Sequence, residues 1–496
     1  MNYPIITAEE AASLISNGDT IGIGGFSSVG TPKAVPTAIA ERAKKLHAAG
    51  EPFQIGLVTG GASGNPVDND LSLAKAVKFR TPFQSNKGMR NAINSHETDY
   101  FDLHLSQIGQ DVRYGFLGRI NVAILEASEI TDEGDLILST SVGISPTLAL
   151  KAEKIIIELN AKHAGKLRGM HDVFILETPP YRKAIPVFKP NQRAGSSVLK
   201  IDPEKVLGVV KTDLYDNLNP FKPLNDTTKQ IGLNVAEFLI REWRKGGIPK
   251  EFLPLQSGVG NIANAVLGAL GENTQLPALT MYTEVIQNSV IDLMLKERIS
   301  FATGSSLTLS VDQLCKMYDN LDFFRERILL RPQEITNHPE TIRRLGIIAI
   351  NTALEADIFG NVNSTHVLGS TIMNGIGGSA DFSRSSYLSI FTCPSTAKNG
   401  LISSIVPHVS HVDSTEHDVR ILATEYGVAD LRGKSPMQRA ECIIENCAHP
   451  DYRQLLWDYI KLSEGKNYHI PMSLVNAYKM HIAYEQTGDM HNTVFE

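Results

Sequence analysis

The chain has 496 residues, of which 42% are hydrophobic and 20% charged, with a formal net charge of −7. This composition is typical of a soluble globular protein and excludes a disordered or fibrous chain, while the length exceeds one ordinary hydrophobic core, so we expect at least two domains. The negative charge and the lack of a Lys/Arg run argue against general nucleic-acid binding.

The N-terminal residues and the cysteines both indicate an ordinary cytoplasmic enzyme. The first residues lack the basic and apolar blocks of a signal peptide, and no segment reaches the roughly 18 consecutive apolar residues of a membrane span. The four cysteines do not form a disulfide framework, and the spacing of Cys442 and Cys447 is a poor match for a zinc site. We therefore expect reduced thiols and no membrane partner.

The first part of the chain alternates strands, glycine turns and helices. Residues 7–17 are predicted to form a helix, residues 20–26 a strand that enters a glycine-rich turn, and residues 32–46 a second helix. Another strand, over residues 53–58, ends in Thr59-Gly-Gly-Ala-Ser-Gly64. Repeated units of this kind are typical of an open, mainly parallel α/β sheet. Further buried strands are predicted over residues 122–126, 136–138, 154–158 and 206–210.

The motif Gly22-Ile-Gly-Gly25 resembles part of a dinucleotide fingerprint. It does not complete G-x-G-x-x-G, so we interpret its glycines as turn residues and keep dinucleotide binding, as in a nicotinamide dehydrogenase, as the minor alternative.

A domain boundary is predicted between residues 213 and 228, where polar residues and prolines replace the apolar runs. A helix over residues 231–243 follows, and the glycine-turn pattern then begins again. We expect two related α/β domains with mainly parallel sheets, over residues 1–220 and 221–496.

The stretch from Pro277 to Lys296 combines a short buried strand with a helical spacing of apolar residues. Leu279 to Tyr282 is predicted to be the strand, and the apolar residues from Val285 to Met294 lie close to the spacing of one helix face. Glu284 is therefore predicted at a strand-to-helix junction, where the positive end of the helix favours an ionised carboxylate. Such a carboxylate can open an activated acyl group, but glutamate is also a common helix cap, so the residue alone leaves both roles open.

Three loops carry glycine or lysine residues suited to ligand contact. Gly258-Val-Gly-Asn-Ile-Ala263 places two glycines just before a predicted helix, so its backbone can approach a phosphate or carbonyl oxygen closely. Asn374-Gly-Ile-Gly-Gly-Ser-Ala-Asp-Phe382 repeats this pattern, and Lys398 offers a point charge to a phosphate. Turn geometry and solvation explain each loop equally well when it is taken alone.

The second half also contains a histidine-rich segment. His408, His411 and His417 lie within ten positions, together with acidic residues, which raises the hypothesis of a metal site. Because no HExxH or CxxC accompanies them, we favour a polar network or a substrate channel and expect no metal. Glu425 and Arg432 also allow two interpretations, a structural ion pair or contact with a ligand.

Taken together, these motifs resemble the acetyl-CoA hydrolase/transferase family, the class I CoA-transferases. The resemblance extends over nearly the whole chain. It is densest in Gly258-Val-Gly-Asn-Ile-Ala263, Tyr282-Thr-Glu284, Gly377-Gly-Ser-Ala-Asp-Phe382, Val409 to Asp418 and Thr424 to Gly433.

The resemblance implies a role for each matching residue. Glu284 corresponds to the covalent nucleophile of the family, Gly378 is implied to stabilise an oxyanion through its N–H group, and Asn337 and Glu425 are implied to position the carboxylate. Ala380 departs from the family pattern, where glycine is frequent, and its methyl group could narrow the acyl pocket. The positions implied to contact coenzyme A are Val259, Gly260, Asn261, Ile262, Ala263, Asn374, Gly378 and Lys398.

The activity implied is the transfer of CoA between short-chain carboxylic acids through a glutamyl–CoA thioester, with ping-pong kinetics. Succinyl-CoA with acetate is the first substrate pair, and propionyl-CoA with succinate or the hydrolysis of acetyl-CoA are the alternatives. Coenzyme A is then part of the substrate, no tightly bound cofactor is expected, and a homodimer is implied. A different class of hypothesis is a sensor that binds CoA without turnover.

Overall fold

The computed structural model describes residues 3–216, 218, 224–258, 260–464 and 467–496. Chain contacts divide it into two compact units. The first consists of Met1–Pro220, Thr280–Leu345 and Asn374–Asp381, and the second of Phe221–Leu279, Gly346–Met373 and Phe382–Glu496. Both contain mixed α/β structure with mainly parallel strands, which confirms the predicted fold class.

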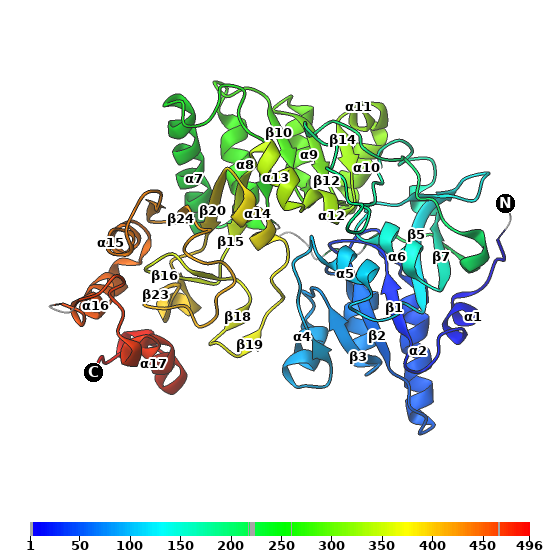
Figure 1. The fold of residues 1–496 in the computed structure, drawn as a ribbon, viewed down its shortest axis with the longest axis horizontal. Helices are drawn as coiled ribbons and strands as arrows, with labels where there is room; N and C mark the ends of the chain where they lie inside the picture. Colours follow the sequence, from blue (N-terminus) through cyan, green and yellow to red (C-terminus); the bar gives the residue numbers. More distant parts are fainter. Residues whose placement is uncertain (1–2, 217, 219–223, 259, 465–466) are drawn as a thin grey trace. The chain divides into compact units, whose positions relative to one another are not determined.

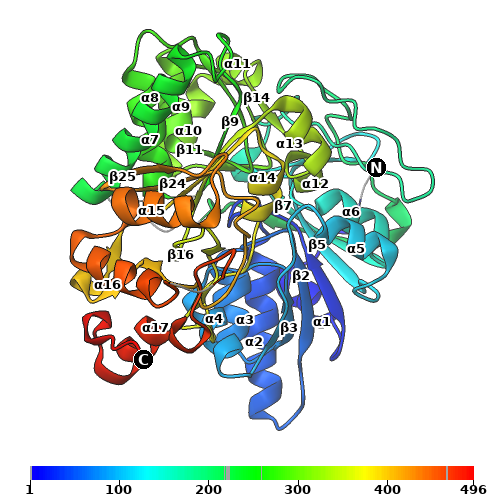
Figure 2. The same cartoon turned by 60° about the vertical axis from the view of Figure 1, so that its left-hand side comes forward.

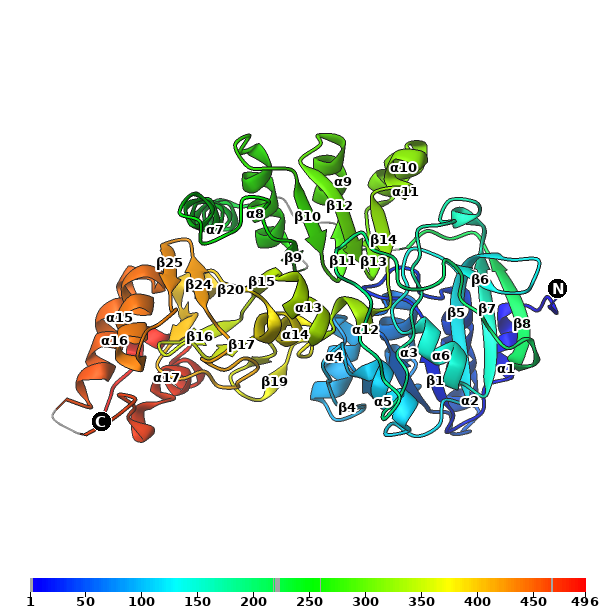
Figure 3. The ribbon, with the colours of Figure 1, turned by 45° about the horizontal axis from the view of Figure 1, so that its top comes forward.

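The first unit is built on a sheet in the order β4-β3-β2-β1-β5-β7-β8, with parallel neighbours (Figures 1 and 3). A further strand, β6, pairs with β5 in the antiparallel direction. The central strands are apolar and buried because helices such as α2 cover the sheet (Figure 2). The strands are β1 Thr20–Ile23, β2 Ile55–Thr59, β3 Val77–Thr81, β4 Asp99–Tyr100, β5 Val122–Ile130, β6 Leu136–Leu138, β7 Lys154–Asn160 and β8 Val206–Thr212.

The strands predicted in this part of the chain are confirmed to within a few residues, and the helices differ in length. The helix predicted over residues 7–17 is shorter, because it begins after a capping box at Thr7 and ends at Ser13. The helices are α1 Ala8–Ser13, α2 Ala34–Ala48, α3 Asp70–Leu73, α4 Lys87–Asn94, α5 Ile108–Tyr114 and α6 Ser145–Lys151.

The segment Thr280–Leu345 packs with the first unit through backbone hydrogen bonds. The Leu307 N–H donates to the Thr140 carbonyl at 2.8 Å, and the Val142 N–H donates to the Ser305 carbonyl at 2.9 Å. Within the segment, β11 pairs with β13 and β12 with β14, all parallel. The elements are β10 Leu279–Tyr282, β11 Val285–Gln287, α9 Asn288–Leu295, β12 Ile299–Gly304, β13 Ser306–Thr308, α10 Val311–Asp319, α11 Leu321–Arg325, β14 Ile328–Leu330, α12 Gln333–Thr336 and α13 Pro339–Leu345; α14 Ser379–Ser385 begins in this unit too.

These contacts mean that the compact units do not follow one cut near residue 220. Glu284 lies in the first unit, although it falls in the C-terminal half of the sequence. A division into domains of residues 1–220 and 221–496 stays a prediction.

In the second unit, β9, β15, β20 and β24 are parallel neighbours, and β25 is antiparallel to β24. Helices α15 to α17 (orange to red in Figure 1) contribute Ile443, Tyr452 and Met480, respectively, to a core shared with Phe391 and Leu422. The longer elements are α7 Asp226–Arg244, β9 Leu255–Ser257, α8 Asn261–Glu272, β15 Ile348–Thr352, β20 Leu388–Thr392, β24 Ile421–Thr424, β25 Gly427–Asp430, α15 Pro436–Cys447, α16 Pro450–Lys461 and α17 Lys479–Thr487. The short strands are β16 Glu355–Asp357, β17 Val362–Asn363, β18 His366–Val367, β19 Thr371–Ile372, β21 Thr396–Ala397, β22 Ile402–Ser403 and β23 Ile405–Val406.

Helices with the length and apolarity that a membrane crossing requires do not occur in the described part of the chain.

Candidate functional site

Glu284 lies between two strands, in a backbone that is held on both sides. It follows β10 and precedes β11, whose residues are buried and pair with β13. The Glu284 carbonyl oxygen accepts hydrogen bonds from the N–H groups of Ser305 and Ser306, at 2.7 and 3.2 Å. These contacts fix the Cα position of Glu284, so its side chain starts from a rigid base.

The predicted helix start at Glu284 was wrong. The helix α9 begins at Asn288, because Val285–Gln287 form a strand, β11, that is buried and paired in parallel with β13. An apolar run of this length fits either a buried strand or a helix turn, and the tertiary pairing decided between them. The Glu284 carboxyl is therefore not held by the N-terminal amides of α9.

The carboxyl is instead held by the side-chain amide of Asn337. Asn337 Nδ2 donates a hydrogen bond to Glu284 Oε1, and the Asn337 side chain is fully buried while Glu284 is half-buried. Burial raises the pKa of the Glu284 carboxyl from 4.5 to about 7, and the bond from Asn337 offsets part of that rise. The expectation of a carboxylate kept ionised by a helix end is thus reversed. A carboxylate with a pKa near neutrality is more basic than an ordinary one, yet a large fraction is ionised at neutral pH.

Gly378 lies directly against this carboxyl group. A Cβ atom at position 378 would collide with Glu284 Oε1 and with Asn337 Nδ2. Glycine is therefore required here by close approach, and its backbone is brought next to the carboxyl oxygen. The structure thus brings together Glu284, Asn337 and Gly378, three residues that the sequence had placed far apart.

One residue of this group was not predicted from the sequence. Asp381, in the first turn of α14, is 6% exposed and accepts a second, longer hydrogen bond of 3.4 Å from Asn337 Nδ2. It lies in the Gly377–Phe382 motif, three positions after Gly378, so the motif already contained the indication.

Asn374, like the three residues around the carboxyl, belongs to the first unit. Its carbonyl oxygen accepts a hydrogen bond of 2.6 Å from the Tyr100 hydroxyl.

The other predicted ligand residues belong to the second unit. Gly260 has a φ of 136°, which favours glycine, and it immediately precedes α8, whose first three residues are Asn261, Ile262 and Ala263. Val259 lies outside the described residues.

Lys398 and Glu425 belong to two different loops of the second unit, after β21 and between β24 and β25. Lys398 is exposed. The Glu425 carboxylate accepts hydrogen bonds from the Ser395 N–H and Oγ, at 2.9 and 2.6 Å. Glu425 thereby anchors the loop that leads to Lys398.

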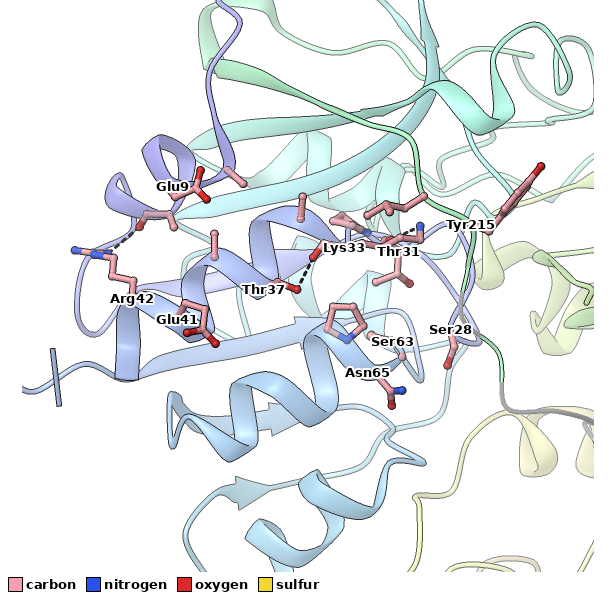
Figure 4. Close-up of a pocket in the computed structure, with 18 of the residues that line it drawn as sticks. Glu9, Ser28, Thr31, Lys33, Thr37, Glu41, Arg42, Ser63, Asn65 and Tyr215 are labelled. Atoms are coloured by element: carbon pink, nitrogen blue, oxygen red, sulfur yellow. Dashed lines mark hydrogen bonds between the residues drawn. The ribbon is translucent and has the colours of Figure 1, made fainter. Parts of the chain in front are cut away.

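A separate cavity of about 750 Å³ lies beside α1 and α2 in the first unit (Figure 4). The carboxylate of Glu158 accepts hydrogen bonds from the N–H groups of Lys33, Ala34 and Val35, at 2.6 to 3.1 Å, so it occupies the start of α2. Lys33 is one of the lining residues, and its ammonium group pairs with Glu126 and Asp216, at 2.5 and 2.9 Å. Carboxylates of the chain itself thus occupy the groups that would bind a phosphate, which argues against a dinucleotide here.

The histidine-rich segment forms polar contacts. His411 Nε2 lies 3.4 Å from Asp413 Oδ1, and the rings of His411 and His366 are 4.0 Å apart. Within the described ranges, no three His, Cys, Asp or Glu side chains are grouped so that they could hold a metal ion.

Two family models match the chain. The acetyl-CoA hydrolase/transferase N-terminal domain matches residues 2–211, and the C-terminal domain of the same family matches residues 314–460. A propanoyl-CoA:succinate CoA transferase from Escherichia coli is 49% identical, over 98% of this chain and 98% of that protein. A succinyl-CoA:acetate CoA-transferase from Clostridium kluyveri is 45% identical over 98% and 90% of the two chains, and an acetyl-CoA hydrolase from Schizosaccharomyces pombe is 42% identical over 96% and 93%.

Solved structures share the fold. RipA from Yersinia pestis matches with a TM-score of 0.70 at 23% identity, over 92% of this chain and 96% of that one. A 4-hydroxybutyrate CoA-transferase from Porphyromonas gingivalis matches with a TM-score of 0.63 at 22% identity, over 92% and 97%.

The raised pKa of Glu284 predicts how stability changes with pH. Because the folded pKa, about 7, exceeds the ordinary value of 4.5, the native state binds this proton more tightly, so the contribution of Glu284 to stability falls as pH rises from 4.5 to 7. Glutamine stays neutral at every pH. The change in the free energy of unfolding caused by Glu284→Gln should therefore be more favourable at pH 8 than at pH 5, by about 1–3 kcal/mol. Urea denaturation of both proteins at the two pH values measures this difference, and an equal effect at both would contradict it.

Close approach at position 378 predicts a severe effect of one added methyl group. Gly378→Ala should lower kcat by about 100-fold or more, because the Cβ displaces the Glu284 carboxyl, and should lower the free energy of unfolding by about 1–3 kcal/mol. Gly268→Ala is the matched control, since a Cβ at this position of α8 meets nothing within 4 Å. Steady-state assays and denaturation test both variants; a Gly378→Ala protein with normal kcat would refute the close contact.

Proposed function

The chain belongs to the acetyl-CoA hydrolase/transferase family, whose members are CoA-transferases and acetyl-CoA hydrolases, and we propose that this member transfers CoA between short-chain carboxylates through a thioester on Glu284. The observation that carries the proposal is the position of the Glu284 carboxyl. It lies against a glycine backbone and accepts a hydrogen bond from a buried amide, Asn337. A structural helix cap would not require this arrangement.

In the first half-reaction, the Glu284 carboxylate attacks the carbonyl carbon of the acyl-CoA thioester. The C–S bond breaks, which gives an acyl-glutamyl anhydride and CoA thiolate. The thiolate then attacks the glutamyl carbonyl carbon, so that the first carboxylate leaves and a glutamyl–CoA thioester remains. Each tetrahedral intermediate carries an oxyanion, and Asn337 Nδ2 and the Gly378 N–H are the donors proposed to stabilise it.

The second carboxylate reverses these steps and leaves as the new acyl-CoA. The attacking groups are anions throughout and no proton is transferred, so the free energy of the thioester is conserved and no ATP is consumed. Coenzyme A enters as part of the substrate, and no tightly bound cofactor has a place in the scheme. Hydrolysis results if water reaches the glutamyl intermediates, so the exclusion of water distinguishes a transferase from a hydrolase.

We assign the binding of coenzyme A to the glycine turn before α8, to Asn374 and to Lys398. At the turn, Gly260 has a backbone conformation that favours glycine, and the N-terminal amides of Asn261, Ile262 and Ala263 suit an anionic group. Val259 is assigned to the same binding on the family resemblance alone, because it lies outside the described residues. Lys398 supplies a positive charge for a phosphate, and Glu425 orders its loop through Ser395.

Succinyl-CoA and acetate form the substrate pair that we propose. A relative of 45% identity is named for this pair, and another of 49% identity is named for propanoyl-CoA and succinate, which is the second candidate. Acetyl-CoA hydrolysis, for which a relative of 42% identity is named, is the third. The homodimer stays a prediction from the family resemblance, and the cytoplasmic location stays one from the N-terminal residues and the cysteines.

Intact mass spectrometry after addition of succinyl-CoA without an acceptor tests the mechanism. We expect a covalent CoA adduct, located by peptide mapping on Glu284 and absent from Glu284→Ala. Glu272→Ala, which removes an exposed glutamate at the end of α8, should retain the adduct and the activity. Turnover that persists in Glu284→Ala without any adduct would refute the mechanism, and binding without turnover in the wild type would favour a CoA sensor.

The same adduct identifies the acceptor. Discharge of the adduct should be much faster with acetate than with water if the protein is the proposed transferase. Faster discharge with propionate would support the second substrate pair, and discharge at the same rate in buffer alone would support a hydrolase.

A further inference from the structure

Asp381 is a buried acidic residue beside the nucleophile to which the proposed chemistry gives no role. Its Oδ2 atom accepts a hydrogen bond of 3.0 Å from the Ser106 N–H, and its Oδ1 atom accepts one of 2.6 Å from Ser106 Oγ. His104 Nδ1 lies 3.9 Å from Oδ1. The carboxylate is thereby fixed in one orientation, in which its Oδ2 atom also faces Asn337 Nδ2.

Asn337 links the two acidic residues. Its Nδ2 atom donates to Glu284 Oε1 and, at 3.4 Å, to Asp381 Oδ2, while its Oδ1 atom accepts a hydrogen bond of 2.9 Å from Thr336 Oγ1. An amide rotated by a half-turn would direct its oxygen at both carboxylates and its NH₂ group at the hydroxyl. An ionised carboxylate offers only acceptors, so Asp381 adds to Glu284 in favouring the orientation in which the N–H groups face Glu284.

We propose that Asp381 is a positioning residue that holds the Asn337 amide with one N–H directed at the glutamyl oxygen of Glu284. The inference rests on the proposed function, because that oxygen carries the developing negative charge when a thiolate or carboxylate attacks the glutamyl carbonyl. Thr336 completes the arrangement from the other end of the amide. A donor oriented before the reaction needs no reorganisation at the moment of attack, which lowers the barrier.

The charge of Asp381 has a second consequence for the reaction. Burial raises the pKa of the Asp381 carboxyl to about 7, hydrogen bonds from Ser106 oppose the rise, and the charge of Glu284 adds to it. Two carboxylates that share one amide donor repel each other. Acylation of Glu284 converts it into a neutral group and removes this repulsion, so the acidic neighbour favours the covalent intermediates over the free carboxylate.

A double-mutant cycle with Asp381→Asn and Asn337→Ala tests the inference. Asp381→Asn should lower kcat and the rate of adduct formation by about 10- to 100-fold, with KM for the acyl-CoA changed less than about twofold, because the affected contact acts in the transition state. In the Asn337→Ala background, Asp381→Asn should lower kcat by less than about twofold, because the amide that Asp381 positions is absent. Asp319→Asn, at the exposed end of α10, is the matched control and should leave all rates unchanged.

A full effect of Asp381→Asn in the Asn337→Ala background would overturn the inference, and so would a normal kcat in the single variant. If Asp381→Asn does not fold, Thr336→Val supplies the second test. It removes the hydroxyl that donates to Asn337 and should lower kcat only when Asn337 is present. Absence of any Glu284 adduct in the wild type would instead refute the proposed function, which separates the two failures.

Discussion

The candidate site depends on the way in which one carboxyl group, that of Glu284, is removed from water. Burial alone would leave an acid with no partner, which is costly. The chain supplies one amide donor, Asn337, and leaves a glycine, Gly378, where any side chain would occupy the position of the carboxyl. The result is a carboxyl group that is fixed in place, with a pKa of about 7. These properties suit a nucleophile better than a surface acid.

The pKa of Glu284 is set by other interactions than those that the local sequence suggested. A helix N-terminus would have stabilised the charged form and lowered the basicity of Glu284. Burial acts in the opposite direction and keeps the carboxylate basic, at the cost of some stability of the native state. The backbone can hold such a group because Ser305 and Ser306 bind the Glu284 carbonyl and β11 pairs with β13. These backbone hydrogen bonds thus offset the cost of burying the Glu284 carboxylate.

The glycine turns of the two units have different surroundings. In the first unit, the start of α2 is occupied by Glu158, so an internal carboxylate takes the position that an anionic ligand would need. In the second, Gly260 introduces α8 with a backbone conformation that favours glycine. A similar pattern of strand, glycine and helix therefore serves structure in one unit and is assigned to ligand binding in the other.

Periodicity and turn residues alone determined the α/β class, six of the eight strands in the sheet of the first unit, and the helix starts near Thr7 and Asn261, because these depend on neighbours in sequence. The strands β3 and β4 were not predicted. Motif matching indicated Glu284, Asn337 and Gly378 as a group. Only the tertiary structure decided that Val285–Gln287 form a strand, that Glu284 packs with the first unit, and that Asp381 shares the Asn337 amide. Strand pairing, burial and a bridging amide each join residues distant in sequence, and their energies exist only once those residues are in contact.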